Sequence, residues 1–171
     1  MDELVDVVNK DNQILGSKMK SLVHRDGDLH RSVHLWIFDS VSKNILLQRR
    51  SFNKDTNAGM LDVSVGGHVA SGEAYGDAWR EIHEELGIAI KEEDIHELGV
   101  ILTKKKPNVH LSQRQTYPKG ILENELCLVA ISPTMQLASR YSFDSGELDS
   151  IIEISLEGFK NLFKGIESIG Q

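Results

Sequence analysis

The sequence has 171 residues, a formal net charge of −7 and a single cysteine. A chain of this length is expected to form one domain, spanning residues 1–171, and its acidity argues against binding to the nucleic-acid backbone, which needs a basic surface. One cysteine excludes an internal disulfide, and because the chain has neither a basic and apolar leader nor an apolar run of about 18 residues, we expect a cytoplasmic protein that does not enter a membrane.

The chain up to Gln48 alternates between short apolar runs and polar turns, a pattern that predicts strands. They are expected at residues 4–8, 14–16, 32–38 and 45–48, the first two forming a hairpin. His24 and His30 fall in the segment between the second and third strands, which reads as a loop. Two histidines this close in a loop are unremarkable by themselves.

Three cations, Arg49, Arg50 and Lys54, follow the last of these strands in a polar segment that runs to Gly59. Arg50 and Lys54 suit the oxygens of a diphosphate, because arginine offers a bidentate fork and lysine a point charge. Surface solubility explains any one of the three equally well. Residues 60–65 then predict a short buried strand.

A glycine-rich loop, Gly66 to Glu73, leads into an acidic helix expected over residues 77–86. Glycines in the loop allow the backbone to approach a ligand closely. In the helix, a period of 3.6 residues separates an apolar stripe from a neighbouring stripe of glutamates. These glutamates are Glu81, Glu84 and Glu85.

The three glutamates are spaced i, i+3, i+4, so they repel one another unless a partner intervenes. A hard divalent cation such as Mg²⁺ or Mn²⁺ takes oxygen ligands of this kind. A solvated acidic helix face is the plain alternative.

The chain after Gly87, which suits a helix end, predicts further short elements. We expect a polar turn of helix at 91–97, strands at 99–103, 141–143 and 151–154, and a helix from Ser155 through Phe163 with Gly165 after it. The long segment 104–119, which carries His110 and Tyr117, reads as a loop of the kind that binds ligands.

Residues 121–131 predict a strand with two unlike faces. A period of two puts Glu123, Glu125 and Cys127 on one face and mainly apolar side chains on the other. Two carboxylates on one face of an otherwise apolar strand are costly to bury unless they are paired or bind a metal. An exposed sheet face is the alternative.

The glycine loop and acidic helix resemble the signature of the Nudix hydrolases, which reads Gly, five residues, Glu, seven residues, Arg-Glu, an aliphatic residue, any residue, Glu-Glu, any residue, Gly and an aliphatic residue. The matching residues are Gly67, Glu73, Arg80, Glu81, Ile82, Glu84, Glu85, Gly87 and Ile88. Only six residues separate Glu73 from Arg80, so the signature is one residue short. We expect the missing residue in the turn around Tyr75 and Gly76; a deletion within the helix would instead displace Glu73.

This resemblance implies a Nudix fold, an α/β (α+β) domain with a mixed β-sheet sandwiched between α-helices. It further implies that Mg²⁺ (or Mn²⁺) is held by the signature, that Glu81 activates water or adds a ligand, and that Arg80 orients the glutamates. The implied metal ligands are Gly67, Glu73, Glu81, Glu84 and Glu85. The expected catalytic residues are Arg80, Glu81, Glu84 and Glu125.

A second resemblance spans roughly residues 5 to 160. His24, His30, His68 and the Glu123-Asn124-Glu125 segment resemble the metal ligands of the type 1 isopentenyl diphosphate isomerases, a Nudix-fold branch in which three histidines and two glutamates bind one divalent metal. Basic residues that match Arg50 and Lys54 hold the diphosphate in that branch. The spacing from His24 to His30 is one residue shorter here.

Two departures argue against the isomerase activity. Gly66 stands where the isomerases carry an essential cysteine, which Cys127 does not replace, and the Arg-Glu and Glu-Glu elements that the isomerases have lost are present. We therefore expect a metal-dependent hydrolase that cleaves a diphosphate bond in a nucleoside diphosphate linked to another moiety, or in a related small-molecule diphosphate. An isomerase with a substitute acid and a non-catalytic diphosphate-binding module are the alternatives, and a homodimer is left open.

Overall fold

The computed structural model describes residues 2–54, 57–105, 122–134, 141–143 and 146–169. Within these ranges the strands are β1 (Leu4–Val8), β2 (Ile14–Met19), β3 (His30–Asp39), β4 (Asn44–Arg50), β5 (Leu61–Asp62), β6 (Val65–His68), β7 (His96–Lys105), β8 (Glu123–Thr134) and β9 (Leu148–Ser155). The α-helices are α1 (Lys20–Asp26), α2 (Glu81–Leu86) and α3 (Leu156–Ile169), and the 3₁₀ helices are η1 (Tyr75–Arg80) and η2 (Glu92–Asp94).

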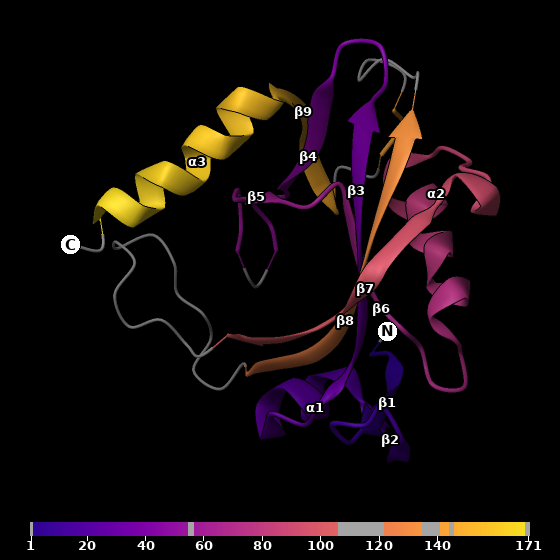
Figure 1. The fold of residues 1–171 in the computed structure, drawn as a ribbon. Coiled ribbons are helices and arrows are strands. Elements are labelled where there is room, and N and C mark those ends of the chain that lie inside the picture. Colours follow the sequence, from indigo (N-terminus) through magenta and orange to yellow (C-terminus); the bar gives the residue numbers. More distant parts are fainter. Residues whose placement is uncertain (1, 55–56, 106–121, 135–140, 144–145, 170–171) are drawn as a thin grey trace.

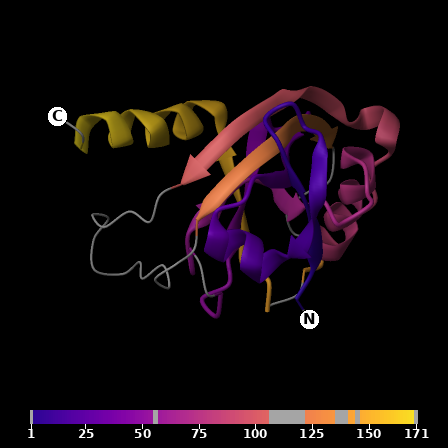
Figure 2. The ribbon, with the colours of Figure 1, turned by 90° about the horizontal axis from the view of Figure 1, so that it is seen from below.

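Strand β3 is the centre of the sheet. It pairs antiparallel with β1, β4 and β6, and parallel with β8. Around this centre β2 pairs with β1, β5 and β9 pair with β4, and β7 pairs with β8, all antiparallel. The sheet is therefore mixed, as predicted, and β7 and β8 extend from it as a long curved ribbon (Figures 1 and 2).

Helices lie on both sides of this sheet (Figure 1). On one side α2 buries Ile82 and Leu86 in a cluster that also contains Leu35 and Val65 from the sheet. On the other side α3 contacts β4 and β9. Burying a side chain such as Leu86 contributes roughly 1.5–3 kcal/mol, so this apolar stripe fixes α2 on the sheet. The predicted α+β sandwich is confirmed.

Several expected elements are present with shifted bounds. The opening hairpin is confirmed, since β1 and β2 pair antiparallel. The strands expected at 32–38, 45–48, 99–103, 121–131 and 151–154 correspond to β3, β4, β7, β8 and β9. The turn of helix expected at 91–97 is the shorter η2, because residues 96 and 97 already pair with β8. The last helix passes through Gly165 to Ile169, beyond its expected end.

Three expectations about secondary structure were wrong, besides the start of the acidic helix, which is described below. His24 lies in helix α1 rather than in a loop: its segment lacks glycine and proline and ends at Gly27, whose φ of 72° terminates the helix. The strand expected at 60–65 is two strands, because Ser64 hydrogen-bonds Leu46 O and Ile37 N while the chain changes partner from β4 to β3. Residues 141–143 form no strand.

The loop expected at 104–119 lies outside the described residues, apart from its first two residues, which belong to β7. His110 and Tyr117 are therefore not described. No helix in the described ranges is long and apolar enough to cross a membrane.

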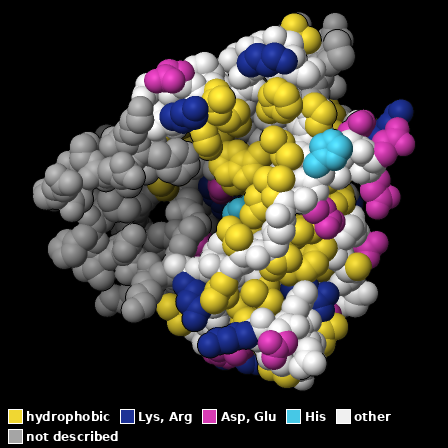
Figure 3. All heavy atoms as spheres, in the orientation of Figure 1, with side chains coloured by type: hydrophobic (Ala, Val, Ile, Leu, Met, Phe, Trp, Pro, Cys, Tyr) yellow, Lys and Arg dark blue, Asp and Glu magenta, His cyan; other side chains and the backbone are white. Residues whose placement is uncertain are grey.

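Apolar side chains gather on the face of the molecule that Figure 3 shows, which β7 crosses in Figure 1. The exposed apolar residues of β7 are Leu98, Val100, Ile101 and Leu102. This strand is an edge of the sheet in the described part of the chain, because it pairs with β8 alone.

Candidate functional site

The missing residue of the signature is absorbed by the winding of η1. Residues Tyr75–Arg80 form a 3₁₀ helix, and α2 begins only at Glu81. Six residues at 3.0 per turn complete about two turns, and seven residues of α-helix would complete about 1.9, so Arg80 emerges in nearly the same direction. The turn expected around Tyr75 and Gly76 is the beginning of this 3₁₀ helix, and the helix expected to start at Asp77 is α-helical only from Glu81, which corrects its start.

Arg80 draws together the glutamates around it. Its guanidinium lies 2.8 Å from Glu73 Oε2 and 3.5 Å from Glu81 Oε1, and its Nε lies 3.8 Å from Glu84 Oε1. A further ion pair joins Arg80 to Glu3 at 3.5 Å. Glu73 also accepts a hydrogen bond from Ala70 N at 3.0 Å, so it is not displaced by the shortened signature.

Glu81 packs directly over Gly67. A β-carbon at Gly67 would lie 2.5 Å from Glu81 Cγ and 2.8 Å from Cδ, so a larger residue would push the carboxylate away. The Glu81 side chain is 18% exposed. Burial raises its pKa, and the nearby Glu84 carboxylate raises it further. Glycine at position 67 therefore lets the carboxylate sit against the backbone of β6.

Glu85 contacts Gly66, the first residue of the glycine loop. Its Oε2 accepts hydrogen bonds from Gly66 N at 3.3 Å and from Gln48 Nε2 at 3.5 Å. Burial raises the pKa of Glu85 to about 8, and the charges of Asp62 and Glu147 act in the same direction. A positive charge placed near this buried carboxyl group would stabilise its ionised form.

Glu84 differs from its two neighbours, because its side chain is 60% exposed. The carboxylates of the signature do not form a group of three with mutually close ligand atoms in the described part of the chain. The sequence placed Glu81, Glu84 and Glu85 in one cluster, whereas the structure turns them toward Gly67, solvent and Gly66 respectively.

The two cations expected to bind substrate are both ion-paired. Arg50 lies 3.4 Å from Asp62, and Lys54 pairs with Glu147. The charges of Asp62 and Glu147 also raise the pKa of Glu85, so both ion pairs lie within electrostatic range of Glu85.

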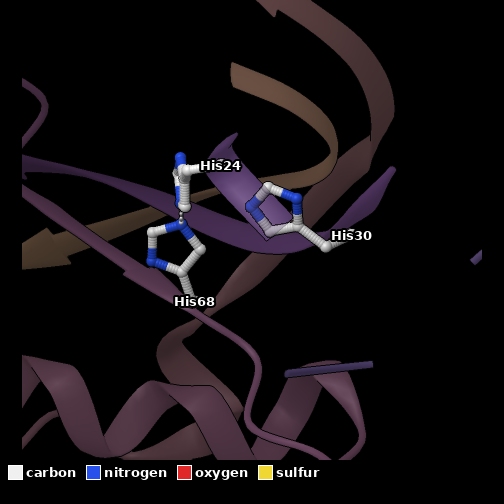
Figure 4. Close-up of side chains that lie close together, drawn as sticks. All are labelled: His24, His30 and His68. Carbon is white, nitrogen blue, oxygen red and sulfur yellow. Dashed lines mark hydrogen bonds between the residues drawn. The ribbon is translucent and has the colours of Figure 1, made fainter. Parts of the chain in front are cut away.

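Three histidines converge from separate elements: His24 from α1, His30 from β3 and His68 from β6 (Figure 4). Their candidate ligand atoms all lie within 4.8 Å of one another, and Nε2 of His24 lies 3.2 Å from Nε2 of His68. His24 Nδ1 and His30 Nε2 are buried without a hydrogen-bond partner among the described residues. Buried polar atoms of this kind are usually satisfied, so their position suits a ligand.

Glu125 completes this group because it stands opposite His30 in the β3–β8 register. Its Oε1 lies 3.5 Å from His68 Nε2 and 3.7 Å from His30 Nε2, and its Oε2 accepts a hydrogen bond from Ser32 Oγ at 2.8 Å. Burial opposes ionisation of Glu125, but the contacts with His68 and Ser32 outweigh it and hold its pKa well below the usual range. Glu123 lies close enough to raise the pKa of His24.

Burial favours the neutral form of two of the three imidazoles, His24 and His68. Burial lowers the pKa of His68 to about 4, and burial together with the charge of His30 lowers the pKa of His24. Neutral imidazole is the form that binds a metal.

Sequence reasoning missed three residues of the site. Lys20 pairs with Glu3 at 3.5 Å, and its charge acts to lower the pKa of His24, His68 and Glu81, so it lies within electrostatic range of both groups. Gln48, which is 1% exposed, contacts Glu85 while its Oε1 has no hydrogen-bond partner in the described ranges. A buried glutamine in an apolar strand was the one available signal.

Asp6 is the third missed residue. It is 5% exposed and accepts hydrogen bonds from Ser71 Oγ at 2.6 Å, Gly72 N at 3.1 Å and Ser17 Oγ at 2.8 Å. These bonds tie the glycine loop to β1. The alternating pattern of residues 4–8 gave no indication of this contact.

Solved structures share this architecture. DR0079 from Deinococcus radiodurans superposes with a TM-score of 0.71 and 23% sequence identity, covering 95% of this chain and 90% of that one. A MutT NUDIX hydrolase from Burkholderia pseudomallei gives a TM-score of 0.55 and 21% identity, covering 76% and 85%. These likenesses concern the fold.

Curated relatives carry related names. Nudix hydrolase 3 of Arabidopsis thaliana is 32% identical over 162 residues, which are 94% of this chain but 20% of that protein. A Nudix hydrolase of Clostridium acetobutylicum is 28% identical over 91% of this chain and 71% of its own length. An isopentenyl-diphosphate Delta-isomerase of Serratia proteamaculans is 40% identical over 90 residues, 52% of this chain and 50% of that enzyme.

A family model described as the NUDIX domain matches residues 28–157, which include the glycine loop, η1, α2 and most of the sheet. The match spans far more than half of the sequence and agrees with the geometry around Arg80. The chain therefore belongs to the NUDIX domain family, whose members among these relatives are named Nudix hydrolases.

Proposed function

We propose that this chain is a metal-dependent pyrophosphohydrolase that cleaves a diphosphate bond in a nucleoside diphosphate linked to another moiety, or in a related small-molecule diphosphate. The observation that carries the proposal is the set of ion pairs from Arg80 to Glu73 and Glu81, at 2.8 and 3.5 Å. They keep the signature assembled although it is one residue short. The net charge of −7 supports a small-molecule substrate rather than nucleic acid. The single cysteine, which is free, supports a location in the cytoplasm.

In the proposed reaction, water attacks one phosphorus of the diphosphate. The water oxygen forms the new P–O bond, the bridging P–O bond breaks, and the second phosphate leaves with the electron pair. Glu81 accepts the proton of the water, a role favoured by its buried position and raised pKa. Arg50 and Lys54 leave their ion pairs with Asp62 and Glu147 to stabilise charge on the phosphoryl oxygens.

The carboxylates of the signature fit a hard divalent cation, Mg²⁺ or Mn²⁺. Glu73, Glu81, Glu84, Glu85 and the Gly67 carbonyl would hold it, and its charge would offset the burial that raises the pKa of Glu85. A cation bound here would lower the pKa of the attacking water and neutralise charge on the phosphates.

We infer a separate metal site at His24, His30, His68 and Glu125, with Glu123 nearby. The two buried nitrogens that make no hydrogen bond among the described residues, and the neutral form that burial favours for His24 and His68, fit a cation. Nitrogen donors suit Mn²⁺ or Zn²⁺ better than Mg²⁺, which prefers oxygen. Here Glu125 acts as a ligand; its low pKa keeps it charged, so it is a weak candidate for the general base that the sequence suggested.

The test is a turnover screen with Mg²⁺ or Mn²⁺ over nucleoside diphosphate sugars, dinucleoside polyphosphates, nucleoside triphosphates and isoprenoid diphosphates. We expect release of a monophosphate from at least one class and its loss in Glu84→Gln or Glu85→Gln. Binding of diphosphates without any turnover would instead favour a non-catalytic binding module.

An isomerase is the second candidate, favoured by the three histidines with Glu125 and by the partial match to the Serratia proteamaculans enzyme. Gly66 offers no thiol or acid to protonate an alkene. Incubation of isopentenyl diphosphate in deuterated water at high protein concentration decides this: we expect no deuterium in the recovered diphosphate, and its incorporation would replace the hydrolase proposal.

A further inference from the structure

Phe52 is an aromatic side chain held at the surface, in the loop between β4 and β5. It is 65% exposed, whereas the other aromatic residues whose burial is described are buried or half-buried. Single exposed apolar side chains are common, so exposure alone gives it no role. The contact of Phe52 with Gly59 and its position between Arg50 and Lys54 suggest one.

One side of the Phe52 ring rests on Gly59. A β-carbon at position 59 would lie 2.8 Å from Cδ1 of the ring, and the φ of Gly59 is +70°, so both the space and the backbone require glycine. The position of Gly59 is fixed by hydrogen bonds from Gly59 N to Arg50 O at 3.1 Å and from Arg50 N to Met60 O at 2.9 Å. The ring therefore rests against hydrogen-bonded backbone at Gly59 while 65% of the residue is exposed.

The two cations assigned to the diphosphate flank the ring in the sequence, Arg50 at the end of β4 and Lys54 in the loop after it. Arg50 and Lys54 lie two residues before and after Phe52, and their partners Asp62 and Glu147 both act on Glu85. A ligand with an anionic group next to a planar group would find cations for the first and an aromatic ring for the second. A nucleoside diphosphate has both groups.

We propose that Phe52 is a stacking platform for the nucleobase of a nucleoside diphosphate substrate. This inference rests on the proposed hydrolase function and narrows its substrate class. Stacking of a base on an aromatic ring is tolerant of base identity, because every base has a π-face. Binding should therefore depend on a planar ring at position 52 more than on which base is present.

An alkyl chain is the competing occupant, because Met60 and Leu61 nearby are 39% and 41% exposed. The two occupants respond differently to substitution. Phe52→Leu keeps an apolar surface and suits an isoprenoid chain, whereas it removes the plane on which a base stacks. Phe52→Trp keeps the plane.

The experiment compares kcat and KM for a nucleoside diphosphate sugar and for geranyl diphosphate, which has no base, in the wild type, Phe52→Ala, Phe52→Leu and Phe52→Trp. For the nucleotide we expect KM to rise about tenfold in the Ala and Leu variants, with kcat and the Trp variant little changed. For geranyl diphosphate we expect no change. Val41→Ala, at a site 68% exposed on the β3–β4 turn, is the matched control.

Equal losses on both substrates, or a Leu variant as good as the wild type, would overturn the proposal. If the wild type hydrolyses neither compound, the hydrolase proposal is decided by the full turnover screen described above, and the platform is tested separately by titration with ADP and Mn²⁺. Binding about tenfold weaker in Phe52→Ala than in the wild type would support the platform; equal binding would refute it.

Discussion

At the scale of single residues, the site depends on close approach between side chains and glycine backbone. Gly67 makes room for Glu81, and Gly66 N–H donates to Glu85, so two adjacent glycines of β6 position two carboxylates of α2. The sequence indicated the glycines and the glutamates but could not indicate which glycine serves which glutamate. That assignment depends on the register of β6 against β3.

Substitution of Gly67 tests this packing. We expect Gly67→Ala to lower kcat at least a hundredfold with the fold retained, because its β-carbon would lie 2.5 Å from Glu81 Cγ and would displace the proposed base. Hydrolysis rates and circular dichroism measure both effects. Gly16→Ala is the matched control, since nothing lies within 4 Å of its β-carbon; similar rates for both variants would contradict the packing argument.

The pKa of Glu85 predicts how stability depends on pH in the absence of metal. Its pKa is raised from 4.5 to about 8, so the folded state binds more protons than the unfolded state between these values. The stabilising contribution is complete below the unfolded pKa and is lost as pH rises through the folded pKa. Chelator-treated wild type should therefore lose more stability between about pH 5 and pH 8 than Glu85→Gln.

Thermal unfolding midpoints of the two proteins across this range provide the measurement. Because every other titrating group is shared, the difference between the two curves isolates Glu85. Parallel curves would show that the carboxyl group titrates near its ordinary pKa.

At the scale of elements, η1 explains how a shortened signature stays assembled. Six residues of 3₁₀ helix rotate the chain about as far as seven residues of α-helix, which leaves Arg80 beside Glu73. The sequence revealed the shortened spacing but not the 3₁₀ winding, in which Ala78 packs in a cluster with Val33, Val69 and Leu128 from distant parts of the chain. Local propensity alone does not decide it.

Changing the length of this element tests the account. Insertion of one alanine after Gly76 restores the spacing of seven residues, and we expect activity within about threefold of the wild type, because α winding then reaches the same direction. Deletion of Gly76 leaves five residues and turns Arg80 by roughly 120°, which should break its pair with Glu73 and abolish activity. The steady-state rates of both variants are the measurement; an inactive insertion variant with a native circular dichroism spectrum would argue against this account.

The elements also show where sequence reasoning succeeded. The apolar stripe of Ile82 and Leu86 and the pairing of β1 with β2 follow from local periodicity, which needs no tertiary information. The position of His24 in α1 and the split between β5 and β6 do not, because each depends on contacts across the sheet. The convergence of His24, His30 and His68 was reached through a family resemblance, since no spacing rule joins residues so far apart.

At the scale of the whole molecule, the structure holds two groups of potential metal ligands joined by the glycine loop. His68 belongs to the histidine group, and Gly67 beside it contacts Glu81 of the signature. The charge of Lys20 acts on the pKa values of residues in both groups, His68 in one and Glu81 in the other. A single domain over residues 1–171 remains the prediction, and light scattering would test whether it forms a homodimer.

Metal stoichiometry tests the two-group arrangement. After chelation and addition of Mn²⁺, we expect the wild type to bind one cation tightly at the histidine group and His68→Ala to bind it at least a hundredfold more weakly. His83→Ala, an exposed histidine of α2, is the control. Isothermal titration measures the affinities; unchanged tight binding in His68→Ala would remove this group from the metal sites.

The most direct test of the account is hydrolysis of a diphosphate substrate in ¹⁸O-labelled water with Mg²⁺. We predict one ¹⁸O atom in a single phosphate product of the wild type, detected by mass spectrometry, and no product above background with Glu85→Gln. Labelled product formed at the wild-type rate by Glu85→Gln, or product without ¹⁸O, would contradict the claim that these carboxylates direct water onto the diphosphate.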